Sequence, residues 1–164
     1  EYSIPTRGLI GFRGEFIMET HGDGILDHSF SHYEDHKGDI EHRQNGSLIS
    51  QEKGETTGYA LWKIQERGML FCGPGTKVYE GMIIGENAKE GDIIVNACKG
   101  KKLSNMRTSG SDDAIVLTPP KILSLEQALE FIEDDELVEI TPNNIRLRKK
   151  TLNETDRKRS ARSN

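Results

Sequence analysis

The chain has 164 residues, a net charge of −5 and 34% hydrophobic residues. This length accommodates one ordinary domain or two small ones, and the low apolar fraction indicates a thin, loop-rich core rather than a helical bundle. No run of about 18 apolar residues is present, which argues against a membrane-spanning helix. The two cysteines favour a reducing compartment over a disulfide scaffold or a zinc site. The chain begins at Glu1 without a signal-peptide pattern, so we expect a piece of a longer protein.

Charge is distributed unevenly along the sequence. Residues 1–96 and residues 122–142 each carry −7, whereas residues 97–121 carry +3 and residues 143–164 carry +6. Exposed charges are screened beyond about 10 Å at ordinary salt, so local blocks decide whether a surface can contact phosphates. The two basic blocks therefore keep nucleic-acid binding open despite the acidic total.

The N-terminal part predicts half of a split βαβ unit. Residues 1–5 fit the end of a strand, residues 6–20 carry apolar side chains at helical spacing, and residues 25–33 fit a second strand. Residues 34–46 are polar and charged and predict a linker. Asn45-Gly46 at its end predicts a hairpin turn that leads into a strand.

The middle of the chain predicts several short strands. Residues 57–67 fit a helix or a strand equally well. Strand-like runs follow, and their even spacing indicates a small barrel or a curled sheet. These runs span residues 69–72, 77–84, 92–97 and 114–117.

The clearest helix covers residues 124–133. Ser124 and Gln127 have the spacing of a capping box, and the apolar side chains that follow share one face. Residues 137–140 and 145–147 predict a final strand pair, and residues 151–164 are too polar to be expected to order. The predicted fold class is therefore α+β: a partial, split βαβ piece, then a β-rich, barrel-like domain with a capped helix.

The residues predict no catalytic, cofactor or metal site. Neither a phosphate-binding P-loop nor a serine nucleophile elbow is present. His28, His32 and His36 lie four residues apart on or beside a predicted strand, where solvent-facing or packed roles are favoured over a metal site. The acidic run of residues 133–136 indicates a solvated turn rather than a cation site. We therefore expect no enzyme activity from this chain.

The strongest functional feature is a long polar segment, residues 98–111, between two predicted strands. Lysine and arginine can neutralise phosphates there, while serine and asparagine can donate hydrogen bonds to phosphate or ribose oxygens. Long polar loops on rigid sheets often carry function, although an ordinary solvated loop fits this composition equally well. The predicted RNA-binding residues are Lys99, Lys101, Lys102, Ser104, Asn105, Arg107 and Ser109.

A second basic block lies in the last predicted strand. Strand alternation places Arg146, Arg148 and Lys150 on one face, opposite the buried face of Leu147. We predict that these three residues, together with Lys149, form the second RNA-binding patch.

Five segments of the chain resemble the C-terminal part of the BipA/TypA family of ribosome-associated translational GTPases. They are PTRGLIGFRGEF, RGMLFCGPGTKVYEGMIIGEN, VNACKGKKLSNMRTSGSDDAIVLTPPK, LEQALEFIEDDELVEITPNNIRLRKK and NETDRKRSAR. The resemblance implies that residues 1–42 are the C-terminal part of a domain V-like, ferredoxin-like domain. It further implies that residues 43–152 are the family's own C-terminal domain and that residues 153–164 are a basic flexible tail.

The resemblance also implies a function in translation, large-subunit assembly and stress adaptation in the cytoplasm. The partners would be the 70S ribosome or its large subunit, through 23S rRNA and the acceptor region of A-site tRNA, with residues 99–111 as the contacting loop. GTP and Mg²⁺ would bind an upstream domain that this chain lacks. The residues leave one alternative open, a protein-interaction module whose acidic surface, residues 122–142, docks a basic ribosomal protein or the upstream domains.

Overall fold

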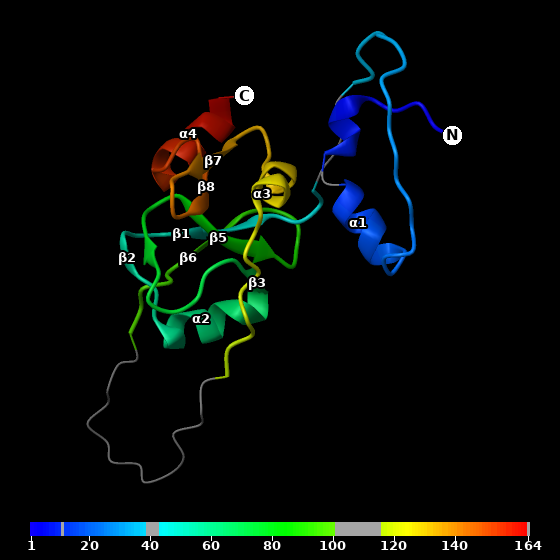
Figure 1. Cartoon of the computed structure of the whole chain (residues 1–164). Helices are drawn as coiled ribbons and strands as arrows, with labels where there is room; N and C mark the ends of the chain where they lie inside the picture. Colours follow the sequence, from blue (N-terminus) through cyan, green and yellow to red (C-terminus); the bar gives the residue numbers. More distant parts are fainter. Residues whose placement is uncertain (11, 39–42, 101–115, 164) are drawn as a thin grey trace, which may run out of the picture.

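A mixed six-stranded sheet forms the centre of the fold in the computed structural model, which describes residues 1–10, 12–38, 43–100 and 116–163 (Figure 1). The strand order is β6-β1-β5-β8-β7, and β3 also pairs with β5. The strands are β1 (Ser47–Ser50), β3 (Gly68–Leu70), β5 (Met82–Asn87), β6 (Ile93–Val95), β7 (Glu136–Ile140) and β8 (Ile145–Lys149). A small second sheet pairs β2 (Gly54–Glu55) with β4 (Lys77–Val78).

Strand β5 connects the two halves of the main sheet. It pairs antiparallel with β1, β3 and β8, whereas β1 and β6 run parallel. A Cβ atom at Gly85 would lie 2.4 Å from the carbonyl oxygen of Met69. Glycine at this position therefore allows β3 to pair closely with β5.

Helices cover both faces of the sheet, as Figure 1 shows for α2 (Gly58–Ile64) and α3 (Leu125–Phe131). The core under α2 includes Leu48 and Ile84, and the core under α3 includes Ile49 and Ile83. Neighbouring residues of one strand point to opposite faces, so both faces of β1 and β5 are apolar. Burial on two sides explains the continuous apolar run of β5.

The remaining helices are short. The N-terminal part contains the 3₁₀ helix η1 (Thr6–Leu9) and α1 (Phe12–Glu19), and the 3₁₀ helix η2 (Gln65–Arg67) extends α2. Residues Glu154–Ser163 form α4, which corrects the prediction that the C-terminal tail is frayed. The side-chain oxygen of Asn153 accepts hydrogen bonds from the backbone N–H groups of Thr155 (2.9 Å) and Asp156 (3.3 Å). This cap satisfies backbone N–H groups at the start of the helix, a contribution that the polar composition of the tail does not reveal.

Several predicted elements are confirmed. The fold is α+β, the predicted helix is α3, and the final strand pair is β7 with β8. The Ser124 hydroxyl accepts a bond from the Gln127 N–H (3.2 Å), and the Gln127 side chain accepts one from the Ser124 N–H (3.0 Å). Residues 57–67, which fitted helix or strand, are mostly helical because Ala60, Leu61 and Ile64 share one buried face.

Other predictions are wrong. The sheet is open rather than barrel-like, with β6 and β7 at its edges among the described strands. Residues 25–33 form no strand, because a strand needs a paired neighbour and none lies beside them in the described part of the chain. Gly46 donates to the Lys89 carbonyl (3.0 Å) and accepts from the Asn87 N–H (2.8 Å), so it closes no hairpin before β1. Of the strand predicted at residues 114–117, the first two residues lie outside the described ranges and the last two form no strand.

None of the helices in the described ranges is both long and apolar enough to cross a lipid bilayer.

Candidate nucleic-acid interface

The first described residues of the segment predicted to bind RNA are held at the N-terminal end of α2. The Thr57 hydroxyl caps α2 by accepting a hydrogen bond from the Ala60 N–H (3.1 Å). The same hydroxyl donates to the Lys99 carbonyl oxygen (2.7 Å), and the Thr57 N–H donates to the Ala97 carbonyl oxygen (3.0 Å). One residue therefore both starts the helix and holds the beginning of the loop.

The chain that follows this segment, from Val116 on, is held at the other end of the helix. Gln65 follows α2, and its side-chain amide donates to the Val116 carbonyl oxygen (3.0 Å) and accepts from the Thr118 N–H (3.0 Å). The Lys121 N–H then donates to the Leu70 carbonyl oxygen in β3 (2.8 Å). The described residues on either side of residues 101–115 are thus hydrogen-bonded at the two ends of α2.

Lys99 is exposed at the first of these anchors. Its carbonyl is bound by Thr57, which leaves the side chain available to solvent and to a ligand. The other residues predicted for this loop lie outside the described residues: Lys101, Lys102, Ser104, Asn105, Arg107 and Ser109.

The second predicted patch, on β8, is partly used within the fold. The Arg148 guanidinium forms an ion pair with Glu139 (Nε–Oε1 2.8 Å), and the Tyr79 hydroxyl donates to the same carboxylate (2.5 Å). Burial and this hydrogen bond raise the pKa of Tyr79, so its phenol stays a donor. Arg146 is half-buried and Lys150 is exposed, so these two residues remain the more accessible cations of the patch.

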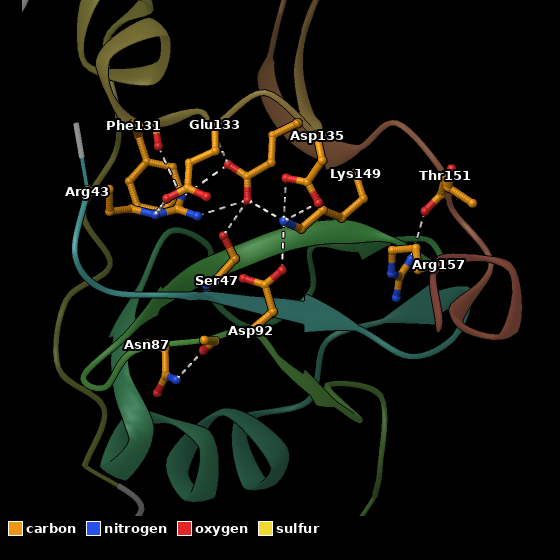
Figure 2. Close-up of polar contacts among 12 residues, drawn as sticks. Arg43, Ser47, Asn87, Asp92, Phe131, Glu133, Asp135, Lys149, Thr151 and Arg157 are labelled. Atoms are coloured by element: carbon orange, nitrogen blue, oxygen red, sulfur yellow. Dashed lines mark hydrogen bonds and ion pairs between the residues drawn. The ribbon is translucent and has the colours of Figure 1, made fainter. Parts of the chain in front are cut away.

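Lys149 is placed differently from the prediction, which assigned it to RNA. Its side chain is 2% exposed, and its ammonium group lies 2.6 Å from Asp92, 2.8 Å from Glu136 and 3.0 Å from Asp135 (Figure 2). An ammonium group surrounded by three carboxylates inside the fold has no free donor to offer a phosphate. Lys149 is therefore an internal ion-pair partner, and the prediction for this residue is corrected.

Glu136 is the centre of this buried cluster, and its side chain is fully buried. The Arg43 guanidinium donates to both of its oxygens (3.0 and 3.1 Å), and the Ser47 hydroxyl donates to one of them (2.8 Å). Arg43 also donates to the Phe131 carbonyl oxygen (3.0 Å) and lies over the Phe131 ring at 4.2 Å (Figure 2). The cluster joins the segment before β1 to α3, β7 and β8.

The cluster keeps its members ionised. Burial alone would raise the pKa of Glu136, but hydrogen bonds from Arg43 and Lys149 outweigh burial and hold that pKa below its ordinary value of 4.5. Burial likewise opposes the charge on Lys149, but its hydrogen bonds to Asp92 and Glu136 raise its pKa above 10.5. Paired charges of this kind are stable inside a fold only while every partner is present.

The acidic run of residues 133–136 is therefore more than the solvated turn that its composition predicts. Asp134 is exposed, whereas Glu136 is buried and Asp135 contacts Lys149. No three His, Cys, Asp or Glu side chains are grouped as a metal ion would require within the described ranges.

Two family models match the chain. One, described as the TypA/BipA C-terminal domain, matches residues 45–154. The chain belongs to the TypA/BipA family. The other, described as the elongation factor G C-terminus, matches residues 1–44, and the two matches meet just before β1.

Curated relatives in this family carry the name large ribosomal subunit assembly factor BipA. The chain is 58% identical to the protein of Haemophilus influenzae over 164 residues and 55% identical to those of Salmonella typhimurium and Escherichia coli K12. Each match covers 99% of this chain but 27% of the relative. The chain therefore spans about a quarter of the length of the curated relatives it matches.

Sequence reasoning missed Arg43, Asp92 and Glu136 as members of a charged cluster. One signal was present, because strand alternation places Lys149 on the same inward face as Leu147. Nothing local to Arg43 or Asp92 shows which distant carboxylate or ammonium each one contacts.

The cluster makes Lys149 important for stability. We expect Lys149→Met to lower the free energy of unfolding by about 3 kcal/mol, the low end for breaking a buried ion pair, because Asp92 and Asp135 stay partly exposed. Lys150→Met is the matched control, since it makes the same chemical change at the exposed neighbour and should alter stability by less than about 0.5 kcal/mol. Denaturant unfolding of both variants measures the difference, and equal losses would contradict the assignment.

Acid should weaken the cluster through Glu136. Because its folded pKa lies below its ordinary value, its ionised form contributes stability above about pH 4.5, and this contribution is lost as pH falls through the folded pKa. We expect the stability gap between the wild type and Glu136→Gln to shrink as the pH is lowered below 4.5. Unfolding curves at several acidic pH values test this, and a gap that stays constant would show that Glu136 has no depressed pKa.

Proposed function

We propose that this chain is the ribosome-binding module of a BipA/TypA-type translational GTPase. In this proposal the loop of residues 99–111 contacts 23S rRNA and the acceptor region of A-site tRNA, on the 70S ribosome or the large subunit. The observation that carries the proposal is the anchoring of the backbone at Lys99 and at Val116 to the two ends of α2, with the Lys99 side chain exposed. The name of these relatives, large ribosomal subunit assembly factor, supports the same partner.

Anchoring matters energetically for such a contact. Binding costs free energy when it orders a segment of chain, and hydrogen bonds that already fix the backbone at Lys99 and at Val116 reduce that cost. Lysine and arginine side chains gain affinity by releasing counterions from the nucleic acid, whatever its sequence. Serine and asparagine can then set the register on the backbone by hydrogen bonding.

A second contact is proposed at β8 through Arg146, Arg148 and Lys150. Lys150 is exposed and Arg146 is half-buried, whereas Arg148 must share its guanidinium with Glu139. The patch is therefore expected to contribute less affinity than the loop.

The activity of the whole protein is proposed from its family. GTP and Mg²⁺ would be bound by a part of the relatives that this chain does not match, since the match covers 27% of their length. The module would then position the GTPase on the ribosome during translation, large-subunit assembly and adaptation to stress in the cytoplasm.

The loop proposal predicts a specific salt dependence. If four loop cations each contact one phosphate, replacing Lys99, Lys101, Lys102 and Arg107 by Ala should reduce the slope of log K against log salt by about 3 to 4. The matched control replaces four other lysines, Lys37, Lys53, Lys77 and Lys89, which are exposed and give the same change in net charge. Binding to large ribosomal subunits is measured over a range of salt. If the salt dependence weakens by the same amount in both variants, the loop has no special role in binding.

A protein-interaction module remains the competing function, in which the acidic surface of residues 122–142 docks a basic ribosomal protein or the upstream domains. The fold weakens this candidate, because Asp135, Glu136 and Glu139 are already paired with cations of the chain itself. Pull-down of ribosomal components before and after nuclease treatment separates the two functions. Retention that survives nuclease would favour the protein-interaction module.

A further inference from the structure

The outward side of α2 carries aromatic side chains between the two loop anchors. Trp62 is 39% exposed, and its ring centroid lies 6.5 Å from that of Tyr59. The Lys63 ammonium lies over the Tyr59 ring at 4.7 Å. The opposite side of the helix, with Leu61 and Ile64, is buried against the sheet. Figure 1 places this helix at the face of the sheet opposite α3.

The hydrophobic core does not account for Trp62. Helix α2 contributes Ala60, Leu61 and Ile64 to one of the two core clusters of the described residues, and the Trp62 ring belongs to neither cluster. A tryptophan that is more than one third exposed leaves part of a large apolar ring in water, and that part gains nothing from folding. Its position instead offers a flat surface for a ligand.

We infer that Trp62, supported by Tyr59 and Lys63, is a stacking site for an unpaired RNA base. This inference rests on the proposed function, because the RNA is the strand that the anchored loop contacts. Aromatic side chains stack on nucleobases whatever the base, and a nearby cation attracts the phosphates on either side of it. Lys63 on the helix and Lys99 at its N-terminal anchor supply that charge.

The geometry favours RNA over a protein partner at this surface. Thr57 and Gln65, at the two ends of the helix, hold the backbone at Lys99 and at Val116, so a phosphate that binds the exposed Lys99 lies close to the N-terminal end of α2. The site also lies on a helix packed on the core, which keeps the ring in place without a ligand.

Trp62 is the one tryptophan of the chain, so its fluorescence reports on this site alone. We expect an oligouridine strand to quench the emission of the full chain, whereas an abasic strand of equal length should bind through its phosphates and leave the emission unchanged. Equal quenching by the two strands would overturn the inference, because quenching would then not require a base.

Substitution of Trp62 provides the second measurement. Trp62→Ala should bind labelled oligouridine at least about fivefold more weakly than the wild type with an unchanged salt slope, because a stacking contact is lost and no charge is removed. Trp62→Phe keeps a ring and should recover most of the affinity, which separates stacking from misfolding. Ile140→Ala is the control, since Ile140 is an exposed apolar residue on the edge strand β7 and should leave binding unchanged.

The outcomes separate this inference from the function on which it rests. RNA binding that depends on the loop cations, with no quenching and full affinity in Trp62→Ala, would overturn the stacking site and leave the proposed function intact. Failure of the wild type to bind either oligouridine or ribosomal RNA would overturn both. Loss of affinity for a protein component in Trp62→Ala, with RNA binding unchanged, would assign the surface to a protein partner and also overturn the inference.

Discussion

The arrangement of the C-terminal half of the sheet depends on the contacts of one buried carboxylate, that of Glu136. It accepts hydrogen bonds from Arg43 and Ser47, which lie about ninety residues earlier in the chain, and contacts Lys149 on β8. Lys149 in turn contacts Asp92, which lies just before β6. A carboxylate left in this position without its cations would be costly, so packings that separate these segments are disfavoured. One ionic cluster thereby holds several parts of the chain in a single arrangement.

The same cluster changes how the surface charge should be interpreted. In sequence, residues 122–142 form an acidic block and residues 143–164 form a basic one. In the fold, these blocks lie partly against each other, because Lys149 neutralises Asp135 and Glu136 while Arg148 pairs with Glu139. Charges that are satisfied internally cannot attract a partner strongly, since the local potential, not the block total, steers binding. The internal pairing therefore weakens both the acidic docking surface and the β8 patch, and it leaves the anchored loop as the better RNA-binding candidate.

Local signals in the sequence were sufficient for the elements that depend on neighbouring residues. The capping box of Ser124 and Gln127 predicted the start of α3, and the runs at residues 137–140 and 145–147 predicted the strand pair β7 and β8. The predicted strand at residues 25–33 failed because strand formation depends on a distant partner, which no local pattern reveals. Strand alternation places Lys149 on the buried face, whereas its charge favours an exposed position. Lys149 is buried, so alternation predicted its position correctly. The identities of its carboxylate partners depend on tertiary structure and could not be read from the residues around it.

Helix α2 connects the core to the candidate interface within a few residues. Ala60, Leu61 and Ile64 fix its position against the sheet, and the residues at its two ends hold the loop that carries the predicted phosphate contacts. A helix that is rigid for reasons of packing can hold two loop ends a constant distance apart and can present an aromatic ring on its remaining face. Because packing of the buried side fixes the helix whose ends carry both anchors, a substitution on that side would disturb the anchors, whereas a substitution on the outward side need not disturb the core. Packing on one side of α2 and hydrogen bonds at its two ends therefore let a thin hydrophobic core fix the backbone at Lys99 and at Val116.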